Sequence, residues 1–342
     1  MSLATAAMGA GERIAWPDPL LRAAISMLVG RTRRRLCLKD ASAEFEFARR
    51  MAEYPIAINT REANEQHYEI PPEFFALMLG PQRKYSCCYY EHAGTSLAEA
   101  EECALAETAE HAALADGQRI LELGCGWGSL SLWIARRYSA ARIVAVSNSR
   151  SQRSFIAQRA QAEGLRNLTA VAADINSFTP PGQFDRVVSV EMFEHMSNWR
   201  ELLRRIVSWL TPQGALFLHV FSHRRAPYRF DAADRGDWIA QHFFSGGIMP
   251  SHGLIRQFGD LVAVEADWWW DGTHYRRTAE HWLENFDRNA EAIDDVLRGF
   301  YGADAALWHR RWRLFLHATA GLFGHSNGEE WGVSHYRLRP AR

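Results

Sequence analysis

The chain has 342 residues, of which 47% are apolar, and its formal net charge is −1. This length can build one large domain or two modest ones, and the apolar fraction excludes an intrinsically disordered chain. The nearly balanced charge provides no broad basic surface, so we expect no nucleic-acid partner. Since no apolar run reaches the ~18 residues that cross a bilayer, we expect no transmembrane segment.

Cysteine usage and the N-terminal stretch bear on the location of the protein. The cysteines lack metal-ligand spacing, and their odd number and one adjacent pair predict reduced thiols in the cytoplasm. They are Cys37, Cys87, Cys88, Cys103 and Cys125. An apolar stretch at 20–29 precedes an arginine cluster at 31–35. A helix end with solvated arginines is the simpler interpretation, and a basic amphipathic helix peripheral to a membrane stays open.

In chain order, residues 1–103 favour helices over most of their length, and we expect a helical cap and a substrate-side segment there. Residues 104–224 alternate between strand-like and helix-like runs. We predict strands at 120–123, 143–147, 168–172, 186–190 and 215–221, helices at 129–138, 150–163 and 197–210, and a turn at 211–214. This alternation predicts an α/β fold whose parallel sheet is covered by helices on both faces.

Residues 225–342 break this regular alternation. A loop-rich stretch at 222–258 is followed by a strand at 261–270, helices at 278–300 and 304–322, and a final strand at 331–338. We interpret this part as an inserted lid that also completes the sheet and the acceptor pocket. Ligands of parallel sheets bind beyond the carboxyl ends of the strands, so we expect the site at that edge.

The first predicted strand runs into a glycine-rich turn. Gly124, Gly126 and Gly128 are spaced by two, Glu122 precedes them, and a predicted helix follows. Glycine allows a positive φ and lets a ligand approach the main chain, while the helix N-terminus offers unpaired N–H groups. The G-x-G-x-G spacing differs from the G-x-G-x-x-G of dinucleotide folds. It looks like the first motif of S-adenosylmethionine-dependent methyltransferases; a plain glycine turn in a nucleotide-type α/β fold is the alternative.

The next two strand ends offer candidates for binding an adenosyl group. Folds of this type commonly place a carboxylate after the second strand to hold the ribose hydroxyls, and this chain has none there. Asn148 and Gln152 are therefore candidates for that role. Asp174 follows the third strand and could accept a hydrogen bond from the adenine amino group, and helix capping is its alternative role.

The fourth predicted strand ends at an acidic and imidazole cluster that consists of Glu191, Glu194 and His195. Burying such groups is costly unless they are paired, and histidine is the usual proton carrier near neutral pH. In a helical turn Glu191 and His195 would share one face. That spacing also suits a metal, but the sequence shows no third ligand and we expect no metal. A satisfied buried histidine is the alternative for His195.

Several segments together resemble the cyclopropane-fatty-acid-synthase superfamily of methyltransferases, and within it the members similar to coclaurine N-methyltransferase. They are E-Q-H-Y (65–68), K-Y-S-C-C-Y (84–89), L-G-C-G-W-G-S-L-S-L (123–132), E-M-F-E-H-M (191–196), F-F-S-G-G-I-M-P-S (243–251) and N-G-E-E-W-G-V-S-H-Y (327–336). The resemblance implies a class I, Rossmann-like fold with a mainly parallel seven-stranded sheet. It also implies S-adenosylmethionine as cofactor, S-adenosylhomocysteine as product, and cofactor contacts from Tyr85 and Ser86.

The resemblance leaves two kinds of acceptor open. The amine enzymes imply a small secondary or tertiary amine of the benzylisoquinoline kind, and the C-terminal segments favour them. The lipid enzymes build cyclopropane rings on unsaturated phospholipid acyl chains with a bound bicarbonate as base. Residue by residue, that bicarbonate set is matched by Cys87, Glu191, His219 and Tyr275. Phe243 and Phe244, with the tryptophans at 268–270, suit a flat or apolar substrate, or core packing. A homodimer is left open.

An amine acceptor would require a base in the site, because an amine that is protonated at pH 7 has no lone pair for the methyl group. We expect His195 to take that proton, with Glu191 or Glu194 orienting the imidazole or pairing with the ammonium. For a lipid acceptor, a bound base would instead remove a proton from the methyl group added to the alkene. The sequence leaves open which of the three residues is the base.

Overall fold

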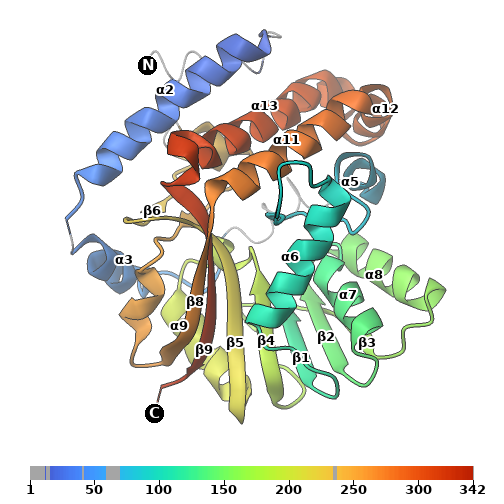
Figure 1. Cartoon of the computed structure of the whole chain (residues 1–342), viewed down its shortest axis with the longest axis vertical. Helices are drawn as coiled ribbons and strands as arrows, with labels where there is room; N and C mark the ends of the chain where they lie inside the picture. Colours follow the sequence, from blue (N-terminus) through green and yellow to red (C-terminus); the bar gives the residue numbers. More distant parts are fainter. Residues whose placement is uncertain (1–11, 13–15, 41, 59–69, 234–236, 342) are drawn as a thin grey trace.

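The computed structural model describes residues 12, 16–40, 42–58, 70–233 and 237–341. Its centre is a seven-stranded sheet (Figure 1). In sheet order the strands are β3 (Leu168–Ala172), β2 (Arg142–Ser147), β1 (Arg119–Leu123), β4 (Phe184–Val190), β5 (Leu210–His223), β9 (Trp331–Pro340) and β8 (Val262–Asp271). Strands β1 to β5 pair in parallel, and β9 runs antiparallel to both β5 and β8. The predicted α/β class with a mainly parallel seven-stranded sheet is confirmed.

Amphipathic helices flank the parallel strands. They are α6 (Leu97–His111), α7 (Ser129–Arg137), α8 (Arg150–Ala162) and α9 (Trp199–Trp209). In α9 the Oδ1 atom of Asn198 caps the helix by accepting a hydrogen bond from the backbone N of Glu201 at 3.0 Å. Its buried positions, Trp199, Leu202 and Ile206 among them, recur every three or four residues, so one face packs into the apolar core. The helices predicted at 129–138, 150–163 and 197–210 therefore form.

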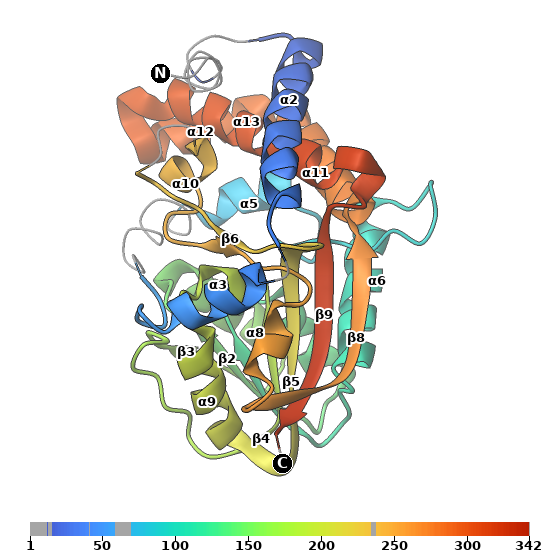
Figure 2. The same cartoon turned by 90° about the vertical axis from the view of Figure 1, so that its left-hand side faces the viewer.

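A second layer of helices lies over the carboxyl ends of the parallel strands (Figures 1 and 2). It consists of α2 (Asp18–Cys37), α5 (Pro72–Met78), α10 (Trp238–His242), α11 (Gly272–Arg288), α12 (Ala290–Tyr301) and α13 (Ala305–Phe323). Ile25 of α2, Phe74 of α5 and Trp312 of α13 are buried in one shared apolar core. Segments from both ends of the chain thus cover the sheet edge together, and the bounds of the three domains stay predictions.

The remaining elements are short. They are α3 (Ala43–Met51), the antiparallel pair β6 (Tyr228–Arg229) and β7 (Ile248–Met249), and the 3₁₀ turns η2 (Phe193–His195), η3 (Leu254–Phe258), η4 (Gly302–Asp304) and η5 (His325–Gly328). Among the helices in the described part of the chain, none combines the length and the apolar character of a membrane span.

Two predicted element boundaries are wrong. The helix predicted at 278–300 is two helices, because at Asn289 the backbone leaves the helical region (φ −103°, ψ 21°) and the side-chain Nδ2 donates to the carbonyl of Leu77 at 2.8 Å. The turn predicted at 211–214 lies inside β5. There Leu210 already pairs with Phe184 on β4, and the register shifts before the next pairs form.

Candidate active site

A cavity of about 280 Å³ lies between the carboxyl ends of the parallel strands and the helical layer. The loops after β1, β2, β3 and β4 line it from the sheet side. Helices α10, α11 and α13, with the segment 83–86, line it from the other side. This is the edge of the sheet where a parallel topology predicts a ligand.

The glycine turn after β1 forms one end of the cavity. Gly124 (φ 77°) and Gly126 (φ 52°) both adopt the left-handed conformation that glycine tolerates best. A Cβ atom at Gly124 would come within 2.6 Å of Cγ of Met192, whereas one at Gly126 would meet open space. The turn is therefore packed against the protein at one glycine and open at the next, as a ligand lying along its backbone requires.

Most of the predicted cofactor-binding residues line the cavity. They are Tyr85, Ser86, Gly124, Gly126, Asn148, Gln152 and Asp174. The Oε1 atom of Gln152 lies 2.8 Å from Oγ of Ser147, which fixes the amide. Oδ1 of Asp174 accepts hydrogen bonds from N (2.9 Å) and Nδ2 (3.0 Å) of Asn176, so Asp174 lines the cavity and also stabilises the local turn. Polar groups thus surround the glycine turn, and the site fits an adenosyl group.

Glu122 and Gly128 lie behind the cavity wall. Glu122 is 2% exposed and accepts a hydrogen bond from Oγ of Ser131 in α7. Burial raises the pKa of this carboxyl to about 7. A Cβ atom at Gly128 would come within 2.6 Å of Cγ1 of Ile156 in α8. The structure places both residues as supports of the turn and its helix, not among the residues that face the cavity.

The open space at Gly126 allows a direct test of the cofactor end. We expect Gly126→Val to raise the Kd of S-adenosylhomocysteine at least about tenfold, or ~1.4 kcal/mol, because the new side chain occupies the ligand's place. Isothermal titration measures this. Gly164→Val is the matched control, since Gly164 also has a positive φ (68°) and open space around its Cβ position, outside the cavity. Equal Kd values for Gly126→Val and the wild type would contradict the assignment.

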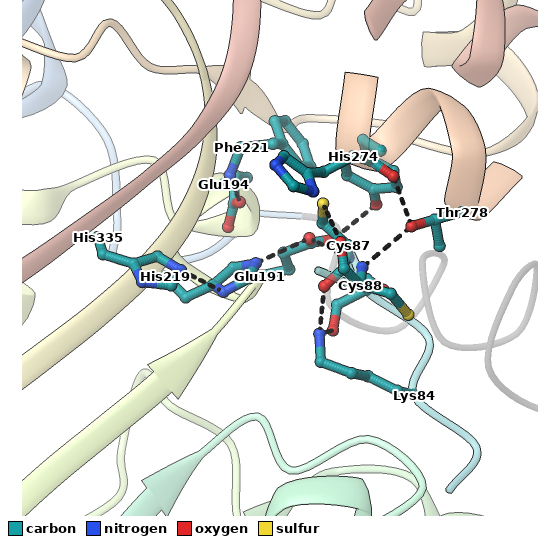
Figure 3. Close-up of polar contacts among 12 residues, drawn as sticks. Lys84, Cys87, Cys88, Glu191, Glu194, His219, Phe221, His274, Thr278 and His335 are labelled. Carbon is teal, nitrogen blue, oxygen red and sulfur yellow. Dashed lines mark hydrogen bonds and ion pairs between the residues drawn. The ribbon is translucent and has the colours of Figure 1, made fainter. Parts of the chain in front are cut away.

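A second part of the cavity is built around Glu191, the residue after β4 (Figure 3). Its φ of 48° is rare outside glycine, and strain of this kind is typical of functional positions. Its Oε1 accepts a hydrogen bond from the backbone N of Cys87 at 2.8 Å and lies 3.2 Å from Nε2 of His219. Its Oε2 accepts one from the hydroxyl of Tyr275 at 2.7 Å. Burial raises the pKa of Glu191, and the charge of Lys84 opposes that rise.

The four residues that match the bicarbonate set are thus brought together around one carboxylate. Within this set, Glu191 and Tyr275 line the cavity, whereas Cys87 and His219 are fully buried behind it. The thiol of Cys87 lies 3.4 Å from the carbonyl oxygen of Cys88, and burial raises its pKa. Cys87 and His219 therefore contact Glu191 from behind the cavity wall, and their part in a substrate or bicarbonate pocket stays a prediction.

His195 lines the cavity, whereas Glu194 is buried behind the cavity wall. Glu194 is fully buried; its Oε1 accepts a hydrogen bond from the backbone N of Phe221 at 2.6 Å, and its Oε2 has no hydrogen-bond partner among the described residues. Burial and the neighbouring Glu191 raise its pKa. His195 lines the cavity, with its ring 4.3 Å from that of Phe244. Burial lowers the pKa of His195 to about 4, against the effect of Glu191, so its ring is neutral at pH 7.

The described residues contain no group of three or more histidine, cysteine or carboxylate side chains that could hold a metal ion. The predicted i, i+4 helical face is absent at this position, because only the 3₁₀ turn η2 follows Glu191. Glu191, in the loop after β4, and His195, in the turn η2, nevertheless both line the cavity.

Aromatic side chains form the remaining wall of the cavity. Phe243 and Phe244 line it as predicted. Sequence reasoning missed others, which are Trp127, Phe221, Phe230, Trp282 and Phe315. Helical spacing could have revealed one of them, since Trp282 stands seven residues after Tyr275 on the buried face of α11. The tryptophans at 268–270 do not line this cavity; they belong to β8, where Trp270 is buried in the core.

Residues 57–330 match the family model described as mycolic acid cyclopropane synthetase. The (S)-coclaurine N-methyltransferase of Thalictrum flavum subsp. glaucum is 37% identical over 285 residues, which are 82% of this chain and 79% of that protein. The cyclopropane-fatty-acyl-phospholipid synthase of Escherichia coli (strain K12) is 29% identical over 271 residues, 79% of this chain and 66% of that protein. A solved structure of coclaurine N-methyltransferase bound to N-methylheliamine and S-adenosylhomocysteine has a TM-score of 0.91 at 33% identity, covering 95% of this chain and 96% of that one.

The sheet order, the glycine turn and these relatives define the protein as an S-adenosylmethionine-dependent methyltransferase. The chain belongs to the mycolic acid cyclopropane synthetase family. The resemblance stated from the sequence is thereby confirmed, together with the cofactor and the enzyme class. One segment that carried it, at 65–68, lies outside the described residues.

Proposed function

We propose that the protein methylates the nitrogen of a small secondary or tertiary amine that carries aromatic rings, of the benzylisoquinoline or tetrahydroisoquinoline kind. One observation carries this proposal: Glu191 and His195 line a cavity that is also lined by several aromatic side chains. An ammonium there gains attraction from a carboxylate and from ring faces, and its rings gain apolar contacts. The relatives support the proposal, since they include coclaurine, pavine and tetrahydroprotoberberine N-methyltransferases.

The chain's own residues would hold both reactants and move one proton. When bound, S-adenosylmethionine supplies an electrophilic methyl group. The glycine turn, with Asn148 and Asp174, would hold its adenosyl part at one end of the cavity. The aromatic side chains of the cavity would orient the amine toward it, and alignment of this kind provides much of the rate gain of such reactions.

Proton removal falls to the acid and imidazole cluster. His195 is neutral at pH 7, the form that accepts a proton. We propose that it takes the proton from the ammonium, as the sequence predicts. Glu191, which raises the pKa of His195, would stabilise the positive charge while it moves from the amine to the imidazole. Glu194 supports the turn from behind through its hydrogen bond with Phe221.

The lipid reaction is the second candidate, because the four residues of the bicarbonate set are retained. In this structure, however, the donors of that set already serve Glu191: the backbone N of Cys87 and the hydroxyl of Tyr275 donate to its carboxylate. The carboxylate of Glu191 thus already occupies the hydrogen-bond donors that a bound bicarbonate would need. This favours the amine reaction.

An acceptor assay tests the proposed function. Purified protein would be incubated with S-adenosylmethionine labelled in its methyl group, and either with tetrahydroisoquinoline amines or with vesicles of unsaturated phospholipid. We expect label in the amine and no dependence on added bicarbonate. Label in the lipid alone, at a rate that rises with bicarbonate, would replace the amine proposal with the lipid one.

We further propose a cytoplasmic protein, in line with its five free thiols. Leu20 and Met27 on α2 and Leu38 just after it are exposed beside the arginine cluster at 31–35. This apolar and basic surface suits peripheral contact with a membrane or with a second copy of the chain.

A further inference from the structure

A row of imidazoles leads from Glu191 across the sheet and away from the cavity. His219 on β5 is paired in register with His335 on β9, and His335 is paired with Trp268 on β8. His111, at the end of α6, stacks on the ring of Trp268 with centroids 3.9 Å apart. Strand pairing and one helix end therefore bring three histidines together from distant parts of the sequence.

These rings form a continuous series of contacts. Nε2 of His219 lies 3.2 Å from Oε1 of Glu191, and its Nδ1 lies 2.8 Å from Nε2 of His335 (Figure 3). Nδ1 of His335 lies 2.8 Å from Nδ1 of His111. Nε2 of His111 lies 3.3 Å from Oε2 of Glu107. Every ring nitrogen of the three histidines thus has a polar neighbour in the series: three of the contacts are hydrogen bonds, and the contact of His111 with Glu107 is an ion pair.

The two ends of the series differ in their access to solvent. Glu191 faces the cavity, His219 and His335 are completely buried, and His111 is 7% exposed. The side chain of Glu107 is 35% exposed. The series therefore joins a group in the acceptor pocket to a carboxylate on the outer surface of α6.

Burial keeps these histidines neutral. It holds the pKa of His219 and of His335 well below the ordinary histidine value and lowers that of His111 to about 4. Two cations act in the same direction: Lys84 on His219 and His335, and Arg337 of β9 on His111. At the surface end, burial and the charges of Glu110 and Glu91 raise the pKa of Glu107.

We propose that His219, His335 and His111 form a proton relay from Glu191 to Glu107 and then to solvent. The proton that His195 takes from the acceptor passes to Glu191, which interacts electrostatically with His195, and enters the relay there. The proposal rests on the proposed function, since N-methylation of an ammonium releases a proton inside the cavity. Without such a path the proton would remain beside the acceptor, where it can protonate the amine again. A ring whose two nitrogens both contact the next group can accept a proton on one side and release one on the other.

The protons balance along this series. It contains four contacts, and each needs one proton to be a hydrogen bond. Three neutral imidazoles bring one proton each, and the fourth is the proton released by the acceptor, which the Glu191 carboxylate receives first. With that proton on Glu191, every ring donates toward Glu107. When one proton has moved across each of the four contacts, Glu107 is protonated and every ring donates toward Glu191. The rings must return to their first tautomers before the next turnover, so the first turnover is the one to measure.

Two variants of His111 test the relay. His111→Phe keeps a ring on Trp268 but removes both nitrogens, and His111→Ala leaves a space near the surface. We expect both to lower the single-turnover rate of amine methylation about tenfold or more. Added imidazole should restore the rate of His111→Ala but not of His111→Phe, whose ring fills the space. The loss should shrink as the pH rises toward the pKa of the amine, because the acceptor then enters without its extra proton.

The controls separate a relay from a structural role. His281→Phe changes a half-buried histidine outside the series, which contacts Tyr90, and should keep the wild-type rate. The Kd of S-adenosylhomocysteine should stay unchanged in all variants. A wild-type rate in His111→Phe would overturn the relay, as would a loss that is equal at every pH and unaffected by imidazole in His111→Ala. If the wild type itself methylates no amine, the proposed function fails first and the relay with it.

Discussion

Glu191→Gln is expected to lower kcat by roughly 10²–10⁴-fold, the range that proton transfer by a positioned side chain usually supplies. The amide cannot accept a proton at this position. It also turns an NH₂ group toward one of the donors that now share the carboxylate, which are the backbone N of Cys87 and the hydroxyl of Tyr275. The backbone N of Cys87 can only donate, so the NH₂ group should face Tyr275, whose hydroxyl would have to turn its proton away and accept. The site should therefore lose its charge and change its hydrogen bonding.

The measurement for Glu191→Gln is the single-turnover rate with saturating amine, together with the Kd of S-adenosylhomocysteine. The Kd should change by no more than about threefold, or ~0.7 kcal/mol, because the carboxylate of Glu191 contacts Cys87, His219 and Tyr275 and not the glycine turn. Glu330→Gln is the matched control, since Glu330 is a buried carboxylate that pairs with Arg33 at 2.5 Å outside the cavity. A wild-type kcat in Glu191→Gln would remove this carboxylate from the reaction.

The parts of this protein that sequence reasoning could predict are those encoded locally. Alternating apolar runs specify the parallel strands, and the spacing of Gly124 and Gly126 specifies the turn between β1 and α7. The cluster at Glu191 and His195 follows directly after a predicted strand, so the sheet edge was enough to place both residues in the cavity.

What could not be predicted depends on contacts between distant segments. Glu122 shares the glycine motif, yet it turns toward Ser131, and only the packing of α7 on the sheet decides that direction. The helix break at Asn289 depends on a hydrogen bond with Leu77, far away in the chain. The relay depends on the register of β5 with β9, which pairs His219 with His335, and on the end of α6 reaching that same row. None of these has a signature in local spacing.

His195→Ala is expected to lower kcat at least about tenfold, because a cavity without the imidazole lacks the group that takes the proton from the ammonium. The Kd of S-adenosylhomocysteine should stay the same.

The pH profile of the wild-type rate also depends on His195. Because burial lowers the pKa of His195 to about 4, its ring stays neutral as the pH falls through the range where an ordinary histidine takes up a proton, near 6.5. The contribution of His195 to the wild-type rate should therefore persist to about pH 5 and disappear only as the pH approaches 4.

Two variants make the test of His195 specific. His195→Asn keeps a polar side chain of similar size that cannot take up a proton, and should be nearly as slow as His195→Ala. His92→Ala changes an exposed histidine and should match the wild type. If His195→Asn retained the wild-type kcat, His195 would act through shape or hydrogen bonding alone, and Glu191 would have to receive the proton directly from the ammonium. The relay would then begin with direct transfer from the acceptor to Glu191. Glu191→Gln should then remain slow, and any loss in His195→Ala would come from the missing shape or hydrogen bond.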